Sequence, residues 1–520
     1  MTSCSRQAAT PAPVPGSIIV LAAFGTIGGM LFGFDVSSMS AWIGADQYLD
    51  YFDHPSSTLQ GGITASMSGG SLVGALAAGF IADPLGRKGA LKIASIIWLV
   101  GSALQSSSQN VAHLIVGRVI NGFAIGITSS QCCVYLAELA PARIRGRVVG
   151  IQQWSIEWGI LIMYLISYGC IRTIEGPAAW RVAWGVQAIP GAVLLGALFF
   201  FPESPRWLAG RDRWEEAFDI LCELHGKHVD RSDPLIIAEW EEVKEAARIA
   251  REASNLTIFG LFGPGIWKRT LAGCSVQVWQ QLLGGNVMLY YLIFVFQMAG
   301  FSGDTALTSS IIQYVLFLVT TGVILPIVDR VGRRPLLLGG ALFGLIIHFA
   351  TAGVMATYGR SVDSVDGNEN LKIIITGDPA RAVIAMMYLF VSMYGLTWAP
   401  IGWIYCSEVF PLHYRAKGVG LAAASNWAFN LALAFFVPPA FENITWQTYI
   451  IFGVFCTVMI PHIYFTYPET AGKTLEEIDV IFDENIAPWK SRHAGPSLQA
   501  RVADLKVQKG EISAEQRETV

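Results

Sequence analysis

Uncharged amide side chains stand inside long apolar stretches of this 520-residue chain. An amide in such a stretch must pair with another polar group or line a cavity, because no water is at hand. It can donate and accept hydrogen bonds at once, and a neighbouring aromatic ring adds an apolar face. This combination suits a small neutral ligand with several hydroxyl groups. The candidates are the amides Gln153, Gln280, Gln281, Asn286 and Asn426, with the aromatic residues Phe32 and Trp403.

Charged residues also occur within apolar stretches. Asp35 and Arg118 each stand alone there, and an unpaired charge inside a membrane is costly. We therefore expect Asp35 and Arg118 to face each other. Glu157 is a further isolated acid, without an evident partner in the sequence.

The composition favours lipid as the main solvent. The chain is 53% hydrophobic and 14% charged, whereas soluble domains carry about 25% charged residues. The net charge of −4 gives no basic surface for nucleic acid. A spanning helix needs about 20 apolar residues, so the sequence predicts an all-α membrane protein with twelve transmembrane helices. They are expected near residues 17–43, 59–82, 89–109, 111–134, 147–170, 181–201, 268–298, 306–330, 335–357, 379–407, 416–441 and 444–467.

Basic residues in the short loops predict the orientation. Arg87 follows the second span and Arg333 the eighth, while the first alternate loop is acidic, which places both termini in the cytoplasm. The apolar run behind the first 16 residues is too long for a signal-peptide core. The cysteines are scattered and no catalytic constellation occurs, so we expect no enzyme, no cofactor and no metal site.

A polar segment divides the chain into two sets of six spans. The expected domains are a cytoplasmic tail (1–16), a six-helix bundle (17–201), a cytoplasmic helical linker (202–267), a second bundle (268–467) and a cytoplasmic tail (468–520). Three elements recur in the same order in both halves. They are Asp83-Pro-Leu-Gly86-Arg87 and Asp329-Arg-Val-Gly332-Arg333, then Glu138, Pro141 and Arg145 with Glu408, Pro411 and Arg415, then Pro202-Glu203-Ser204 and Pro468-Glu469-Thr470.

The repeated charges predict a gate. All of them lie at cytoplasmic helix ends, so they can pair across the interface between the halves when the cytoplasmic side is closed. The alternative is that the arginines only set the orientation. The expected gate residues are Asp83, Arg87, Glu138, Arg145, Glu203, Arg206, Asp329, Arg333, Glu408, Arg415 and Glu469.

Longer motifs carry a resemblance to a known family. The chain resembles the sugar porters of the major facilitator superfamily from the first span to Ile478, through Pro202-Glu-Ser-Pro-Arg206, Gln280-Gln-Leu-Leu-Gly-Gly-Asn286 and Pro468-Glu-Thr-Ala-Gly-Lys-Thr-Leu-Glu-Glu477. The ending of the first span, Asp35-Val-Ser-Ser-Met-Ser40, is similar to fungal high-affinity hexose and pentose transporters, several of which are proton symporters.

The resemblance implies two pseudo-symmetric six-helix bundles and one central alternating-access site. The amides and aromatic residues above match the family's sugar-binding positions, and the Asp35–Arg118 pair matches its proton switch. The implied partners are a small neutral sugar (a pentose or hexose), a proton and the lipid bilayer, with a monomer in the plasma membrane as the functional unit. Open alternatives are a passive hexose facilitator with a merely structural Asp35–Arg118 pair, and a transporter-like sugar receptor.

Helix geometry adds a constraint on the seventh span. Its polar residues spread over more than half of the helix circumference at 100° per residue, so one ligand cannot reach them all on an unbroken helix. We expect local unwinding at Gly284-Gly285, and likewise at Pro400 and Gly402 beside Trp403. For any single amide, the alternative to ligand binding is a hydrogen bond between helices.

Phe317 is a departure that bears on the cargo. It stands where many hexose carriers of the sugar porter family have Asn. A phenylalanine side chain cannot form a hydrogen bond with a hydroxyl group, and it adds bulk beside the substituent of a six-carbon sugar. The interpretation is a carrier tilted toward xylose, which lacks the hydroxymethyl group. The alternative is that Phe317 faces lipid or a neighbouring helix.

Competing uptake of labelled xylose and glucose tests the role of Phe317. An unpaired sugar hydroxyl costs about 1–3 kcal/mol, so Phe317→Asn should move the preference toward glucose by about ten-fold. A clear glucose preference that Phe317→Asn leaves unchanged would contradict the interpretation.

Overall fold

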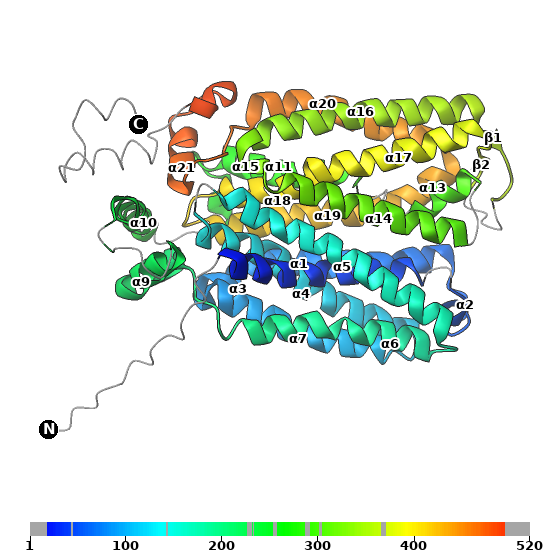
Figure 1. Cartoon of the computed structure of the whole chain (residues 1–520), viewed down its shortest axis with the longest axis horizontal. Helices are drawn as coiled ribbons and strands as arrows, with labels where there is room; N and C mark the ends of the chain where they lie inside the picture. The colour runs from blue at the N-terminus through cyan, green and yellow to red at the C-terminus, as the bar shows by residue number, and fades with distance from the viewer. Residues whose placement is uncertain are drawn as a thin grey trace.

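The chain folds into a bundle of long helices lying side by side, with a small helical group at one end (Figure 1). This computed structural model describes residues 18–42, 45–141, 144–225, 231, 233–252, 257–285, 292–300, 304–365 and 371–493. In the first half, the helices are α1 (Ile18–Ser40), α2 (Asp46–Leu49), α3 (Ser57–Ser106), α4 (Val111–Leu139), α5 (Arg145–Thr173), α6 (Ala178–Val186) and α7 (Ala188–Ala197). Helix α3 covers the second and third expected spans, and α6 with α7 covers the sixth.

The second half supplies the other six expected spans. Its helices are α11 (Trp267–Leu282), α13 (Leu292–Met298), α14 (Asp304–Ile324), α15 (Val328–Val331), α16 (Arg333–Tyr358), α17 (Asp378–Leu396), α18 (Trp398–Glu408), α19 (Arg415–Asn443) and α20 (Gln447–Thr466). The strands β1 (Arg360–Ser361) and β2 (Ile373–Ile374) form a short antiparallel pair in the loop between α16 and α17. The helices thus correspond to the twelve expected spans.

The outer surface of the bundle is apolar. Within the described residues, seven helices are each long and apolar enough to cross a membrane, and Leu59–Ser106 among them is long enough to cross twice. Large side chains such as Val73, Phe80, Val319 and Val458 are about half exposed on the helices. An apolar surface of this extent needs lipid around it, and the chain is therefore a multi-pass membrane protein.

Two spans are broken inside the second half. Helix α11 ends at Leu282 and Gly284 has a φ of +93°, which agrees with the unwinding expected at Gly284-Gly285. The other break lies at Thr397, between α17 and α18, and not at Pro400 or Gly402 as expected. The reason is that a proline ring clashes with the carbonyl group four residues earlier in a helix. Pro400 therefore interrupts the helix about one turn before its own position.

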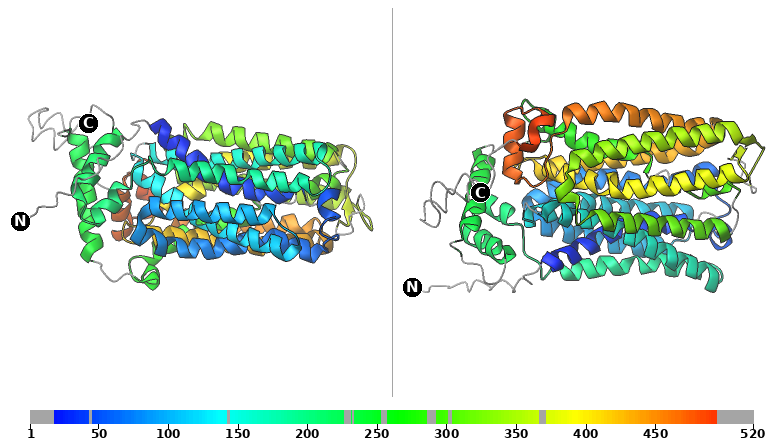
Figure 2. Two further views of the ribbon diagram at one scale, coloured as in Figure 1. Left: turned by 90° about the horizontal axis from the view of Figure 1, so that it is seen from below. Right: turned by 45° about the horizontal axis from the view of Figure 1, so that its top comes forward.

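The two halves meet along a few helix pairs. Within the halves, α1 packs on α5, α3 on α4, α14 on α17 and α16 on α20. Across the interface, α3 and α4 pack on α19, while α5 packs on α14 and α18. The views in Figure 2 show these helices running nearly parallel along the whole bundle. The site expected between the halves therefore lies among α5, α11, α14, α18 and α19.

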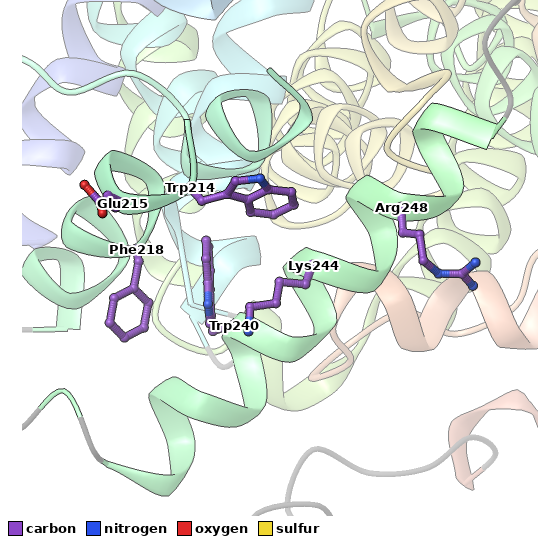
Figure 3. Close-up of a pocket in the computed structure, with 6 residues that line it drawn as sticks. All are labelled: Trp214, Glu215, Phe218, Trp240, Lys244 and Arg248. Carbon is purple, nitrogen blue, oxygen red and sulfur yellow. The ribbon is translucent and has the colours of Figure 1, made fainter. Parts of the chain in front are cut away.

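Short helices gather at the end of the bundle where the repeated charges lie (Figure 2). They are α8 (Pro205–Gly210), α9 (Trp214–His225), α10 (Pro234–Glu252), the 3₁₀ turn η2 (Ile258–Phe262), α21 (Leu475–Asp483) and the 3₁₀ turn η3 (Pro488–His493). Between α9 and α10 lies a cleft of about 540 Å³, with Trp240 edge-on to Trp214 (Figure 3). This cleft is remote in the sequence from all the residues expected to bind the ligand.

Gly86 and Gly332 occupy equivalent positions in the two halves. Their φ angles are +82° and +100°, and a Cβ atom would lie 2.2 Å from Glu203 Oε2 at Gly86 and 2.5 Å from Glu469 Oε2 at Gly332. Only glycine adopts such angles without strain. Each glutamate can therefore reach the backbone N–H groups that follow its glycine. Glu203 accepts from Arg87 N at 3.2 Å, and Glu469 accepts from Arg333 N at 2.8 Å.

Replacing either glycine by alanine should destabilise the fold. With a side chain present, this positive-φ, extended-ψ backbone costs about 1–3 kcal/mol, before the clash with the glutamate is added. We expect a lower melting temperature in detergent for Gly86→Ala and Gly332→Ala. Gly339→Ala is the matched control, because Gly339 lies within α16 and a Cβ there meets nothing within 4 Å. Equal melting temperatures for all three variants would contradict this account.

Candidate functional site

Three amides of α11 and one of α19 form a buried hydrogen-bond network. Gln281 Nε2 donates to Asn426 Oδ1 at 3.0 Å. Asn426 Nδ2 donates to Gln277 Oε1 at 2.7 Å and to Gln280 Oε1 at 3.0 Å. All four side chains are at most 3% exposed. Two of the expected ligand-binding amides of α11 and the expected amide of α19 therefore meet in one place.

The network extends to the broken tenth span and to the other half. Gln280 Nε2 donates to the carbonyl groups of Trp398 and Ala399 at 3.0 and 2.9 Å, just after the break at Thr397. On α3, Ser68 Oγ donates to Asn430 Oδ1 at 2.7 Å. These amides make the hydrogen bonds between helices that the sequence left open as an alternative. A hydroxyl-rich ligand can replace such bonds, since an amide offers both a donor and an acceptor.

Gln153 lies in a second polar cluster, on α5. Its Nε2 donates to Glu157 Oε1 at 3.1 Å, one helical turn away. Thr321 of α14 donates its hydroxyl to the same oxygen at 2.8 Å, so the cluster joins the two halves. Glu157 is 1% exposed, and its Oε2 has no hydrogen-bond partner among the described residues. This carboxyl is the isolated acid of the fifth span.

The expected aromatic residues lie at the same interface. The ring of Phe32 on α1 lies 4.8 Å from that of Trp427 on α19, measured between centroids. Trp403 is buried on α18. Phe317 is 1% exposed and its ring lies 5.7 Å from that of Tyr394 on α17. Phe317 therefore does not face lipid. Asn286 lies outside the described residues.

Asp35 and Arg118 do face each other inside the first half. Both are buried, and Asp35 Oδ1 lies 3.9 Å from Arg118 Nη1. The same guanidinium donates to Ile63 O at 3.0 Å and to Ser38 Oγ at 3.2 Å. The aspartate makes no hydrogen bond through its side chain within the described part of the chain. The pair is thus a loose ion pair in which the arginine is held by its other partners.

An ion-pair cluster recurs at the same end of each half. Arg87 donates to Glu138 through Nε at 3.0 Å and Nη2 at 2.9 Å. Arg333 donates to Glu408 through the same two nitrogen atoms, at 3.2 and 2.8 Å. Paired hydrogen bonds of this kind are among the strongest between side chains. The sequence-based expectation needs a correction here, because these pairs form within the halves, between neighbouring helices of one bundle, and not across the interface.

The third repeated element completes both clusters. Ser204 Oγ donates to Glu138 at 2.5 Å, and Thr470 Oγ1 donates to Glu408 at 2.7 Å. Arg206 Nη1 donates to the carbonyl of Glu138 at 2.9 Å. Burial raises the pKa of Glu203, although backbone N–H groups and Arg87 favour its charged form. All three repeated sequence elements therefore assemble into one structural unit per half.

A smaller set of contacts crosses between the halves at this end. Asp329 accepts from the backbone N–H groups of Gly146 at 3.1 Å and Arg147 at 3.0 Å, at the start of α5. A carboxylate is favourable at a helix N-terminus. Asp83 pairs with Lys417 at 3.0 Å, near the start of α19. The two repeated aspartates thus each contact the start of a helix in the opposite half, Asp329 through backbone N–H groups and Asp83 through a lysine side chain.

Two of the repeated arginines also contact residues beyond their own half at this end of the bundle. Arg415 Nη1 lies 3.6 Å from Glu138 Oε1 in the other half. Arg145 Nη1 donates to Lys473 O at 3.0 Å, just before α21. The end of the bundle that carries the short helices is therefore closed in this structure.

Sequence reasoning missed several residues of these networks. Gln277 stands on the face of α11 that carries Gln281, four residues away, and helical spacing could have found it. Lys417 lies two residues after a repeated arginine, but its partner is not predictable without the fold. The sequence did not indicate a role for Thr321, because the hydroxyl of a threonine in a membrane span usually bonds a carbonyl group of its own helix.

Comparisons with known proteins agree with this architecture. The family described as "Sugar (and other) transporter" matches residues 21–482. The high-affinity glucose transporter of Kluyveromyces lactis is 46% identical over 486 residues, which cover 93% of this chain and 88% of that protein.

Solved structures share the fold. The proton:xylose symporter XylE bound to 6-bromo-6-deoxy-D-glucose gives a TM-score of 0.77 at 28% identity, over 89% of this chain and 99% of that chain. The inward-open conformation of XylE from E. coli gives a TM-score of 0.64 at 27% identity, over 89% of this chain and all (100%) of that one. The TM-score of the inward-open structure is the lower of the two, which agrees with a bundle that is closed at the end carrying the short helices. This chain belongs to the sugar transporter family of the major facilitator superfamily.

Proposed function

We propose that this chain carries a monosaccharide, glucose or xylose, across the plasma membrane together with a proton by alternating access. The observation that carries the proposal is the buried amide network of Gln277, Gln280, Gln281 and Asn426 at the interface of the halves. Glucose transporters are among the relatives, and a proton:xylose symporter shares the fold. Membership in a family of transporters also argues against an enzyme.

The sugar-binding assignment rests on the chemistry of the amides. These amides pair with one another in the structure, so their own buried polar groups are satisfied. A sugar that enters would exchange these bonds for bonds to its hydroxyl groups, with Trp403 and Phe32 as apolar walls. Gln153 would contribute from the other half, and Asn286 stays a prediction.

Alternating access requires the halves to separate at the closed end. The proposed moving units are residues 17–201 and 268–467, joined by the linker 202–267, with both termini in the cytoplasm. The strong Arg87–Glu138 and Arg333–Glu408 pairs lie within the halves and can persist during the movement. The contacts of Asp329, Asp83 and Arg415 must break, and these residues form the proposed gate.

The proposed coupling depends on Asp35. Its carboxylate lies 3.9 Å from Arg118 and accepts no hydrogen bond among the described residues, so binding of a proton there would weaken an ion pair that is already loose. The membrane potential supplies about 2.3 kcal/mol per charge per 100 mV, which is enough to drive accumulation.

Sugar uptake with a simultaneous pH trace tests transport and coupling together. Wild-type chain in transport-deficient cells should take up glucose and alkalinise the medium on sugar addition. Asp35→Asn should abolish the alkalinisation and sugar accumulation while leaving equilibrative exchange. Alkalinisation that persists in Asp35→Asn would contradict the role of Asp35, and a wild type without uptake would contradict transport.

Spin labels at the cytoplasmic ends of the halves test the gate. Leu85 and Val331 are exposed there, and cysteines at both positions report the distance between the halves. Asp329→Asn removes the charge that holds the start of α5, so we expect a larger population of long distances. Asp378→Asn is the matched control, since Asp378 is exposed, starts α17 and pairs with Arg381 of the same helix. Identical distributions in both variants would contradict the gate.

A further inference from the structure

Glu157 is a buried acid whose position the mechanism above does not use. Its Oε1 receives hydrogen bonds from Gln153 and Thr321, so this oxygen is fixed from both halves. Its Oε2 is buried and has no hydrogen-bond partner within the described residues. Leaving a polar atom buried and unpaired is costly. A ligand hydroxyl could supply the missing partner.

The surroundings of Glu157 indicate which part of a ligand could reach it. Thr321 follows Phe317 by four residues on α14, so both lie on one face of that helix. Thr321 Oγ1 also lies 3.2 Å from the carbonyl oxygen of Gly395, the residue after Tyr394. A Cβ atom at Gly395 would lie 2.9 Å from Thr321 Oγ1 and 3.1 Å from Phe317 Cδ2. Glu157 and Phe317 therefore occupy the same corner of the interface.

On the side of Phe317, this corner is formed by two aromatic rings. The rings of Phe317 and Tyr394 pack against each other, and Phe317 offers no hydrogen bond to a hydroxyl. A sugar substituent placed beside Phe317 thus has the carboxyl of Glu157 as a nearby polar partner. Because Gln153 holds the carboxyl by its other oxygen, Oε2 is pre-oriented at no further entropic cost.

We propose that Glu157 is a specificity-determining residue whose Oε2 accepts a hydrogen bond from the hydroxymethyl O–H of a hexose beside Phe317. The inference rests on the proposed function, and it names the substrate class more closely. The bulk of Phe317 disfavours a six-carbon sugar, and the hydrogen bond to Glu157 offsets part of that penalty. Glucose therefore gains from Glu157, whereas xylose, which has no hydroxymethyl group, does not.

Uptake of glucose, 6-deoxyglucose and xylose tests the proposal in two arms. In the wild type, loss of the sugar's hydroxyl leaves Oε2 unpaired, so 6-deoxyglucose should be bound about ten-fold more weakly than glucose, as a higher KM. If the wild type transports these two sugars with equal KM, the proposal is overturned without any variant.

The second arm uses Glu157→Leu. In this variant the KM for 6-deoxyglucose relative to glucose should fall from about ten-fold to about one-fold, because neither sugar can then bond Oε2. The lost bonds from Gln153 and Thr321 act on every sugar and leave this ratio unaffected. A ratio that Glu157→Leu leaves at about ten-fold would overturn the proposal. Thr320→Val is the matched control, since the Thr320 hydroxyl bonds carbonyls of its own helix, at 2.8 and 3.0 Å.

The outcomes separate this inference from the proposed function. A wild type that takes up none of the sugars contradicts monosaccharide transport itself. A wild type that transports glucose without discriminating against 6-deoxyglucose contradicts the role of Glu157 alone. If Glu157→Leu transports no sugar, the wild-type comparison still decides the inference.

Discussion

Charges buried beside a membrane must be paired, and the structure depends on how these pairs are distributed. The Arg87–Glu138 and Arg333–Glu408 pairs are buried and doubly hydrogen-bonded, and removing one partner would leave an uncompensated charge. Both pairs lie inside a half. The side-chain ion pairs between the halves are single contacts, with Asp83 3.0 Å from Lys417 and the buried Arg415 3.6 Å from Glu138. Each half is thus held together more firmly than the two halves are held to each other.

This distribution is what a transporter of two rocking halves requires. As long as each half moves as a unit, the ion pairs within it stay intact. Their contribution to the free energy is then the same in the closed and open states, and these pairs do not oppose the movement. Only the contacts across the interface contribute to the difference between the closed and open states. A few single ion pairs and backbone contacts can contribute a few kcal/mol, which a bound sugar or a proton can match.

The sequence predicted the elements well and their partners less well. Repeated motifs such as Gly86-Arg87 and Gly332-Arg333 identified the two halves, because a glycine at positive φ and an arginine beside it leave the same pattern twice. Length and apolarity placed all twelve spans. The break at Thr397 was missed by three residues, since a proline acts on the carbonyl one turn before it. The repeated charges were expected to pair across the interface, yet Arg87 pairs within its own half, because spacing along the chain does not reveal which helices are neighbours.

For the residues at the centre of the bundle, too, the sequence predicted the site residues but not all of their partners. Gln280, Gln281 and Asn426 could be predicted as a group, since an amide in a membrane span must pair with a polar group or line a cavity. The link from Glu157 to Thr321 could not be predicted, because it depends on the packing of α5 against α14. A threonine hydroxyl satisfied by its own helix and one that reaches across an interface look alike in the sequence.

The α5–α14 interface joins the sugar corner to the closed end of the bundle. Near the middle, Trp154 Nε1 donates to Leu318 O at 3.0 Å and Glu157 bonds Thr321. At the closed end, Asp329 holds the start of α5. Opening of this end would break the contact of Asp329, while the contacts of Trp154 and Glu157 lie further along the same two helices. A ligand that binds Glu157 would therefore act on the same pair of helices whose ends form the gate.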